Sequence, residues 1–247
     1  MRQASKQDIP ALIELWAQCF GDPPAVVQNF FDTLWENILV FTAEDNTSML
    51  TAMPVRWQER DAAYLYAVAT HPEHRGQGLC RDLMAYAEQH LLEHGYSYTT
   101  LHPAGESLYD FYGAMGYETT FYCEKTMFHG KHAHSVHAVS PDTYAMCRKK
   151  FCTDGVEYPR YLLALQEHYG ALVEIENLGC AALEQTASGW TARELLAKDP
   201  ETSAKALCHY LNIDSIAVRM PGTEPFAMAK SLDGSPLRRS YLGLAFE

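Results

Sequence analysis

The chain has 247 residues, a length that suits one large domain or two small ones. Apolar residues make up 47% and charged residues 20%, so the chain can build a hydrophobic core and lacks the composition of a disordered protein. The formal net charge of −12 argues against non-specific binding of DNA or RNA and favours cationic small substrates.

No segment of the sequence predicts export or a membrane. Residues 1–10 lack the basic-then-apolar pattern of a signal peptide. The most apolar run, residues 62–69, is too short to cross a bilayer. The seven cysteines contain no C-x-x-C pair and match no zinc-site spacing, which is typical of reduced thiols in a protein core. We therefore expect a soluble, cytoplasmic protein with no metal and no membrane partner.

Two helices are predicted at the start of the chain. Asp8 caps a helix whose apolar residues follow the 3.6-residue period up to Phe20, and Gly21 ends it. The pair Pro23-Pro24 opens a second helix that runs to Leu34.

Strands then alternate with helices. Strands are predicted at residues 39–43, 48–57 and 62–70, and the last is apolar enough to be covered on both faces. A helix with Leu79, Leu83, Ala87 and Leu91 on one face follows and is closed by Gly95. Three further elements complete this half: a strand at 96–101, a helix at 107–115 and a strand at 117–128. This order predicts a mixed α/β layer.

The second half repeats the order of the first in a weaker form. The helix at 158–169, the strands at 171–175 and 192–197, the helix at 203–211 and the strand at 214–222 correspond to elements between Pro23 and Gly105. We interpret this as a decayed tandem repeat of one fold, although two unrelated α/β segments with the same element order remain the alternative. The predicted domains are residues 1–130 and 141–247, joined by a linker at 131–140.

Four histidines, at positions 129, 132, 134 and 137, lie in or beside this linker. Histidines this close together can bind a metal. Their spacing is irregular and no carboxylate or thiolate accompanies them, so a solvated linker is the better interpretation.

The segment Arg75-Gly76-Gln77-Gly78-Leu79-Cys80 lies between an apolar strand and the start of a helix. Glycines allow backbone N–H groups to turn toward a ligand, and the first turn of a helix has unpaired N–H groups and a partial positive charge. Arg75 and Arg81 flank the segment and can bind phosphate oxygens. The pattern is neither a Walker loop nor a Rossmann fingerprint, and it predicts a site for a pyrophosphate.

In its context, "VATHPEHRGQGLCRDLM", this segment resembles the acetyl-CoA loop of the GNAT (Gcn5-related) N-acetyltransferases, whose pattern is Q/R-x-x-G-x-G/A. The resemblance covers about residues 1–128. It implies that the backbone of Val68, Ala69 and Thr70 contacts the pantetheine arm and the acetyl carbonyl. It also implies that residues 75–80 hold the pyrophosphate. Cys80 departs from the family, which prefers Gly or Ala there.

A second match lies in "SLYDFYGAMGYE", which resembles the family's L-Y-x-x-x-G-F/Y segment. Tyr112 stands four residues before Gly116, and in many family members that tyrosine protonates the departing CoA thiolate. A phenol with a pKa near 10 can supply this proton. Tyr109, one turn earlier, fits the spacing less well, and a structural role for Tyr112 in the core is the alternative.

The second half has "KDPETSAK" where the first has "HPEHRGQG", so we expect one CoA site per chain. Asp199 and Glu201 would also repel phosphates. The tandem arrangement resembles the Eis-like aminoglycoside and lysine acetyltransferases. There the chain terminus supplies a carboxylate near the site, so a base role for the Glu247 terminus is a hypothesis. The second half would shape the acceptor pocket or form the interface of a homodimer.

These features predict direct transfer of an acetyl group from acetyl-CoA to the amine of a small molecule or peptide. Backbone N–H groups near Ala69 would stabilise the oxyanion, and Glu73 or Glu106 could act as base through water. The alternative is a non-catalytic sensor or interaction module that binds acyl-CoA. An aminoacyl-tRNA-dependent transferase is disfavoured because the acidic chain has no basic stripe.

Overall fold

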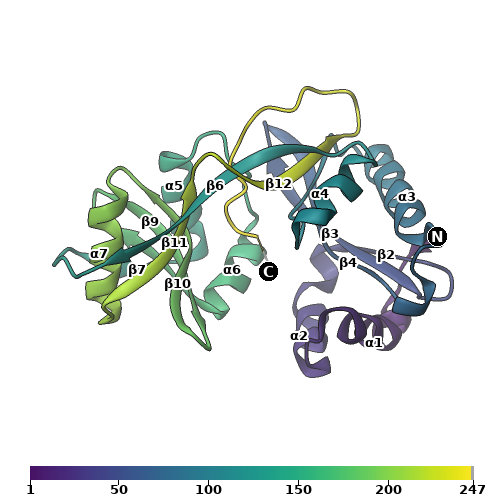
Figure 1. Ribbon diagram of the computed structural model, residues 1–247, viewed down its shortest axis with the longest axis horizontal. Helices are drawn as coiled ribbons and strands as arrows, with labels where there is room; N and C mark the ends of the chain where they lie inside the picture. The colour runs from purple at the N-terminus through teal and green to yellow at the C-terminus, as the bar shows by residue number, and fades with distance from the viewer. Residues whose placement is uncertain (246–247) are drawn as a thin grey trace. The chain divides into compact units, whose positions relative to one another are not determined.

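The computed structural model describes residues 1–245 and contains two compact units (Figure 1). Unit 1 consists of Met1–Glu118 and Met228–Leu237, and unit 2 consists of Thr119–Ala227 and the described residues from Arg238 on. Each unit therefore combines two stretches that are far apart in the sequence.

From Ile9 to Gly113, the helices and strands of unit 1 agree with the predicted ones to within about two residues, whereas the strand at Arg2–Gln3 was not predicted. Each begins and ends where capping residues, glycines or prolines indicate, as at Gly21, whose φ of 79° ends the first helix. The elements are β1 (Arg2–Gln3), α1 (Ile9–Phe20), α2 (Pro24–Leu34), β2 (Leu39–Thr42), β3 (Ser48–Trp57), β4 (Arg60–Thr70), α3 (Leu79–Glu93), β5 (Tyr98–Leu101) and α4 (Glu106–Gly113).

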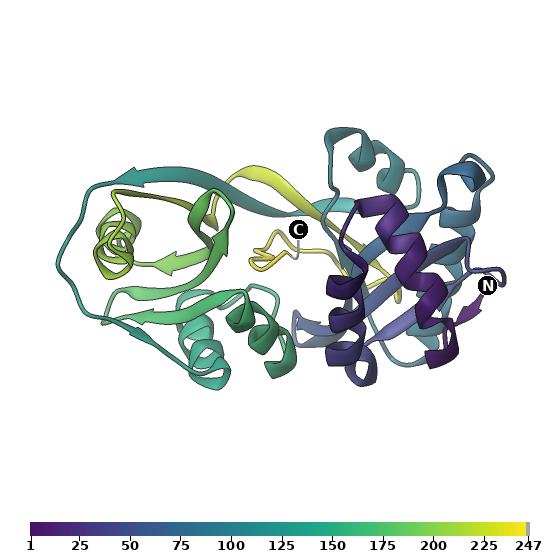
Figure 2. The same cartoon turned by 90° about the horizontal axis from the view of Figure 1, so that it is seen from below.

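The strands of unit 1 lie in the order β1-β2-β3-β4-β5-β12, with β4 and β5 parallel and the other pairs antiparallel. Alternate residues of β4 face opposite layers. Ala63 and Leu65 pack in one cluster with Leu83 of α3. The ring of Tyr66 lies 5.5 Å from Trp16 of α1 on the other side. Figure 2 shows α1 and α2 crossing in front of the strands of this unit.

The last strand of unit 1 comes from the far end of the chain. Strand β12 (Glu224–Ser231) begins in unit 2, and its residues from Met228 on pair with β5, from Met228 opposite Leu101 to Ser231 opposite Tyr98. The exposed hydrogen-bonding edge of β5 is thus completed by a segment about 130 residues away in sequence.

After its first strand, unit 2 repeats the element order that unit 1 has from β1 to β5, as the predicted GNAT-like second half requires, and within residues 1–245 it has no helix that corresponds to α4. Two of its strands and one helix have no counterpart among the predicted elements: β7, β9 and α5. The strand β12 was not predicted either. The elements are β6 (Glu118–His129), β7 (Val136–Ala138), α5 (Pro141–Phe151), α6 (Arg160–His168), β8 (Gly170–Ile175), β9 (Gly179–Thr186), β10 (Gly189–Ala197), α7 (Pro200–Leu211) and β11 (Ser215–Pro221).

The correspondence between the units extends to strand pairing. As β4 pairs with β3 antiparallel and β5 parallel, so β10 pairs with β9 antiparallel and β11 parallel. The antiparallel pair has an irregular register in both units, between Met49 and Thr51 in one and between Ala192 and Glu194 in the other. Strand β7 lies inside the segment 131–140 predicted as a linker and pairs with β8.

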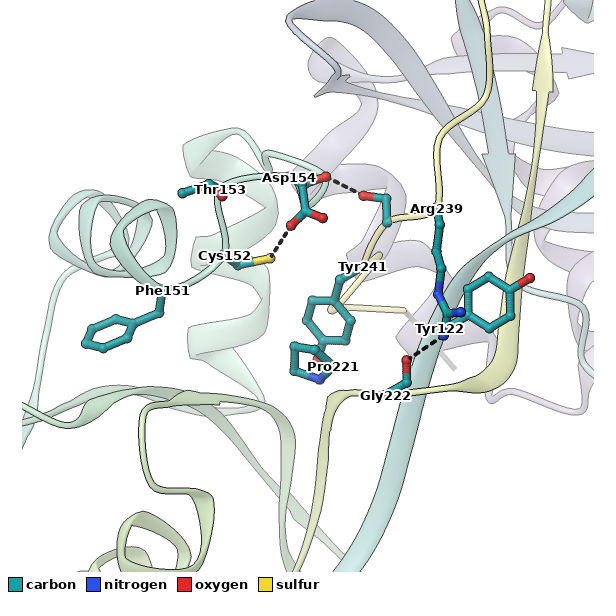
Figure 3. A pocket seen from close by; sticks show the side chains of 10 residues that line it. Tyr122, Phe151, Cys152, Thr153, Asp154, Pro221, Gly222, Arg239 and Tyr241 are labelled. Atoms are coloured by element: carbon teal, nitrogen blue, oxygen red, sulfur yellow. Dashed lines mark hydrogen bonds between the residues drawn. The ribbon is translucent and has the colours of Figure 1, made fainter.

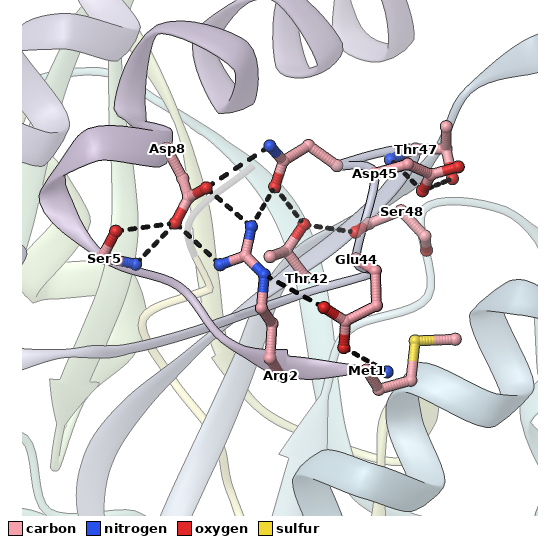
Figure 4. Close-up of polar contacts among 10 residues, drawn as sticks. Met1, Arg2, Ser5, Asp8, Thr42, Glu44, Asp45, Thr47 and Ser48 are labelled. Atoms are coloured by element: carbon pink, nitrogen blue, oxygen red, sulfur yellow. Dashed lines mark hydrogen bonds and ion pairs between the residues drawn. The ribbon is translucent and has the colours of Figure 1, made fainter.

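A polar network ties the N-terminus of unit 1 to the turn between β2 and β3 (Figure 4). The Arg2 guanidinium donates to both carboxylate oxygens of Asp8, at 2.8 and 2.7 Å, and to the Asn46 side chain at 3.2 Å. The same turn accepts a hydrogen bond at Thr47 O from the backbone N–H of His71, 2.9 Å away. The network therefore also supports the start of the loop that follows β4.

No helix within residues 1–245 is long and apolar enough to cross a membrane.

The strand exchange makes a prediction for a shortened chain. Residues 1–130 alone lack Met228–Ser231, so the edge of β5 loses its partner. We expect this fragment to aggregate or to remain unfolded, measured by far-UV circular dichroism and gel filtration. A control chain that joins residues 1–118 through a Gly/Ser linker to 224–237 restores the strand and is expected to fold. A folded, monomeric 1–130 fragment would contradict the requirement for β12.

The Arg2–Asp8 pair makes a second prediction. The hydrogen bond from Arg2 holds the pKa of Asp8 well below its usual value, so the pair stabilises the fold above about pH 4 and loses this effect as the pH falls toward the folded-state pKa. Asp8→Asn is expected to lower the free energy of unfolding by about 2 kcal/mol at neutral pH. The deficit should shrink by about 0.7 kcal/mol near pH 3.5.

Urea unfolding at the two pH values measures this difference. Glu36→Gln is the control, because both side chains of the Lys6–Glu36 pair are exposed. This pair is expected to contribute little to the free energy of unfolding. An Asp8→Asn deficit that stays the same at both pH values would exclude the ionised carboxylate as its cause.

Candidate functional site

Strand β4 contains one more residue than its partner in the middle of their pairing. Met49 lies opposite Ala69 and Thr51 opposite Tyr66, so the extra residue of this bulge is Ala67 or Val68. Ala67 has a φ of 50°, which is rare for a residue with a side chain. A bulge bends a strand and redirects its backbone groups, and such strain concentrates at functional sites. The apolar pattern of β4 carried no signal of this bulge.

The bulge coincides with the end of pairing between β4 and β5. Their parallel register runs from Ala62 opposite Tyr98 to Leu65 opposite Leu101. Residues 66–70 of β4 therefore continue without β5 beside them, within the part of the chain that the structure describes. The predicted contact residues Val68, Ala69 and Thr70 all lie in this stretch. An extended ligand could pair with the strand edge there.

The loop after β4 exposes backbone amides ahead of α3. Gly76 and Gly78 have φ values of 76° and 84°, a region open to glycine at little cost, and a Cβ at either position would meet open space. The first intrahelical bond runs from Asp82 N to Gly78 O. The amides of Leu79, Cys80 and Arg81 lie ahead of it without a helical acceptor. No side chain in the described part of the chain caps the helix at Gly78.

The flanking cations differ in their contacts. The Nε of Arg75 donates to the carbonyl of Thr70 at 3.1 Å, so Arg75 folds back onto the end of β4. The thiol of Cys19 also donates to this carbonyl, at 3.4 Å. The Thr70 carbonyl is therefore already bonded, whereas Gln77 and Arg81 are exposed. Residues 75–78 are exposed and lead directly into the first turn of α3, where Leu79 and Cys80 are partly buried.

Tyr112 lies on α4 and is buried in the same hydrophobic cluster as Leu83 of α3. The partly buried side chains of Val68 and Cys80 pack against this cluster. Burial, with a smaller contribution from the Cys80 thiol, raises the pKa of Tyr112 well above its usual value, so the phenol is protonated at neutral pH. Burial also raises the pKa of Cys80 to about 11, which makes it a poor nucleophile. The structure thus brings together the bulged strand, the start of α3 and Tyr112.

The other candidates lie outside this cluster of buried groups. Tyr109 is half-buried and packs at its edge. Glu73 and Glu106, the carboxylates considered as bases, are exposed. The proposed Glu247 terminus lies outside the described residues.

Unit 2 provides an internal comparison for the start of α3. Its counterpart helix, α7, begins at Pro200 and is capped by Asp199, whose carboxylate accepts from Thr202 N at 3.1 Å and from Thr202 Oγ1 at 2.7 Å. A negative side chain thus occupies the position that Gly78 leaves open in unit 1. This helix start does not suit a phosphate.

The segment from Ser240 to Ala245 lies beside the irregularity of β10. Arg148 of α5 forms a buried bidentate ion pair with Glu194, with N–O distances of 2.8 and 3.1 Å. Arg148 also donates to the carbonyl of Leu242 at 3.3 Å, and the Tyr158 hydroxyl lies 2.6 Å from the same oxygen. A Cβ on Gly243 would lie 2.0 Å from the Glu194 carboxylate, so only glycine fits.

A cavity of about 360 Å³ lies in unit 2 where this terminal segment begins (Figure 3). The Arg239 guanidinium stacks 4.0 Å from the centre of the Tyr122 ring and donates to the Gly222 carbonyl at 3.1 Å. The Cys152 thiol donates to the Asp154 carboxylate at 3.9 Å. The cavity contains none of the predicted site residues.

Within residues 1–245, no group of three or more His, Cys, Asp or Glu side chains is arranged to hold a metal ion. His134, one of the four histidines in or beside the predicted linker, bonds the carbonyl of Glu176 at 2.8 Å.

Comparisons with known proteins agree with the geometry of unit 1. Residues 1–120 match the family model described as an acetyltransferase (GNAT) domain. A comparison with curated proteins finds no match.

Solved structures similar to this chain share its fold over both units. A probable N-acyltransferase from Enterococcus faecalis V583 has a TM-score of 0.71 at 20% identity, covering 94% of this chain and 72% of that one. A GCN5-related N-acetyltransferase from Anabaena variabilis has a TM-score of 0.72 at 16% identity, with coverage of 93% and 72%. Eis1 from Mycobacterium abscessus has a TM-score of 0.65 at 14% identity, again with coverage of 93% and 72%.

At these identities the structural likeness establishes the fold, including the expected similarity to Eis, and the sequence match establishes the family of the first unit. Residues 1–120 therefore form an acetyltransferase domain of the GNAT family, within a chain whose second unit has a GNAT-like fold.

Proposed function

We propose that unit 1 transfers an acetyl group from acetyl-CoA to an amine of a small molecule or peptide. The observation that carries this proposal is the open, uncapped start of α3, which follows directly on the bulged end of β4. The amides of this helix start have no partner within residues 1–245, and together with the helix dipole they favour an anion at this place.

The residues of the loop fit the diphosphate of acetyl-CoA. Gly76 and Gly78 leave the backbone open to a close approach, and the amides of residues 79–81 point ahead of the helix. Arg81 adds an exposed positive charge. The pantetheine arm would then run along residues 68–70, where β4 has no neighbouring strand on one side.

In the proposed reaction the amine nitrogen attacks the acetyl carbonyl, the carbon–sulfur bond breaks, and the amine loses a proton to water. Backbone N–H groups near Ala69 stabilise the oxyanion that forms on the carbonyl oxygen. Tyr112 donates a proton to the departing sulfur, and its phenolate recovers a proton from the water that received the amine proton. Its raised pKa keeps the phenol protonated throughout the physiological range, so this donor is always in the required form.

Unit 2 is proposed to carry no second acetyl-CoA site. Asp199 caps the helix that corresponds to α3, and the segment from Ser240 to Ala245 is buried beside the corresponding irregular strand. The net charge of −12 supports a cationic acceptor, since an acidic surface attracts polyamines, aminoglycosides and lysine side chains.

The phosphate site is tested with Gly78→Glu. The new carboxylate repels the diphosphate and the side chain strains a backbone with φ of 84°, so we expect acetyl-CoA affinity, measured by calorimetry, to fall at least about 10-fold. Gly95→Glu is the matched control, because Gly95 has a φ of 88°, lies just beyond the other end of α3 and also faces open space. Equal loss of affinity in both variants would rule out the assigned phosphate site.

The general acid is tested with Tyr112→Phe, which removes the proton donor and keeps the ring. We expect kcat for thiol release from acetyl-CoA to fall about 100-fold, with the dissociation constant for acetyl-CoA unchanged. The acceptor amines in this assay are spermidine, an aminoglycoside and a lysine-containing peptide. Tyr109→Phe, one turn earlier, is the control and should have little effect.

An unchanged rate in Tyr112→Phe would remove this residue from the mechanism. Acetyl-CoA binding by the wild type without thiol release to any of the three amines would favour a non-catalytic acyl-CoA sensor instead.

A further inference from the structure

A buried carboxylate joins three elements of unit 1 next to Tyr112. The side chain of Glu88, on α3, is 9% exposed. Its Oε2 accepts from the Lys230 ammonium at 2.5 Å, and its Oε1 accepts from the Tyr117 hydroxyl at 2.9 Å. The Thr99 hydroxyl of β5 lies 2.9 Å from the same Tyr117 oxygen. Each polar group of this network is thus satisfied, as a buried charge requires.

Lys230 reaches this network from β12, the strand contributed by the far end of the chain. Its ammonium lies 5.8 Å from the centre of the Tyr117 ring. Its Cε would lie 3.5 Å from a Cβ on Gly116, so the aliphatic stem packs against the turn that ends α4. One side chain therefore contacts both the turn after α4 and the carboxylate on α3.

The turn after α4 contacts Tyr112 through Tyr117. The rings of Tyr112 and Tyr117 meet edge to face, with centroids 5.9 Å apart. The backbone N–H of Tyr117 also donates to the carbonyl of Tyr112 at 3.2 Å. Tyr112 therefore follows any shift of Tyr117, whose own position is set by Glu88 and Lys230. No hydrogen bond within the described chain holds the Tyr112 hydroxyl itself, so packing decides its direction.

We propose that Lys230 and Glu88 are positioning residues for acetyl transfer, which hold Tyr112 toward the start of α3 through Tyr117. The proposal rests on the proposed function of Tyr112 as proton donor. It makes the active site of unit 1 depend on a residue near the end of the chain, because the ion pair forms only when β12 is paired with β5.

The chemistry favours this role over a purely stabilising one. A buried ion pair loses the hydration of both charges, and apolar residues of similar size would often stabilise a fold equally well. A charge pair instead fixes direction, since the two carboxylate oxygens accept from donors on different elements. A displaced general acid costs rate without costing substrate affinity.

The test is a double-mutant cycle between Lys230→Met and Tyr112→Phe, read as kcat for thiol release with the fastest of the three amines. Lys230→Met keeps the stem and removes the charge, and we expect kcat to fall about 10-fold while the acetyl-CoA dissociation constant stays the same. Lys230→Arg should restore most of the rate. In the Tyr112→Phe background, Lys230→Met should have no further effect, because the group that it positions is already absent.

Lys205→Met is the matched control, since Lys205 forms an ion pair of the same 2.5 Å length with Glu201 on the surface of unit 2. It should leave kcat unchanged. If Lys230→Met does not fold, Glu88→Gln replaces it in the same cycle, because the amide keeps the shape of the side chain and loses the charge.

The outcomes separate the two proposals. A Tyr112→Phe variant that is slow, combined with a Lys230→Met effect that is absent or fully multiplicative with it, would overturn the positioning role alone. A Tyr112→Phe variant with the wild-type rate would overturn the proton-donor role and the positioning role with it.

Discussion

The pairing of β5 with the end of β12 is the constraint on which the rest of unit 1 depends. A strand edge without a partner exposes a row of N–H and C=O groups, and here the chain supplies the partner from residues 228–231. The same four residues bring Lys230 into contact with α3 and with the turn after α4. Pairing of the sheet and placement of the candidate general acid are therefore one structural event.

The two units share one arrangement of strands and differ at the start of the helix that follows the irregular strand. Both have a parallel strand pair whose pairing ends where a register irregularity begins, followed by a helix. In unit 1 the helix start is open, at Gly78, and in unit 2 it is closed by Asp199. Beside β10 lies the segment from Ser240 to Ala245, in which the Leu242 carbonyl accepts from Arg148. The strand pairing is the same in both units. They differ in the residue that caps the helix and in the segment that packs beside the irregular strand.

The buried polar groups of the two units follow the same physical rule with different partners. Glu88 in unit 1 is paired with Lys230 and bonded by Tyr117, whereas Glu194 in unit 2 is paired with Arg148 and bonded by Tyr144 at 2.7 Å. Each carboxylate is balanced by one cation and at least one hydroxyl, as burial demands. In each unit a segment from late in the chain completes the network. Lys230 pairs with Glu88 in unit 1, and the Leu242 carbonyl accepts from Arg148 in unit 2.

The sequence by itself determined the features that depend on neighbouring residues. Helical periodicity, caps and glycines located α1, α2, α3 and α4, and the spacing of Gly76 and Gly78 located the loop that we propose binds phosphate, within a segment that matches the GNAT domain model over residues 1–120. Only the tertiary structure decided the bulge at Ala67, the origin of the sixth strand of unit 1 and the contact of Lys230 with Glu88. A bulge changes register without changing the apolar pattern, and a strand exchange joins residues more than a hundred positions apart, so neither leaves a local signal in the chain.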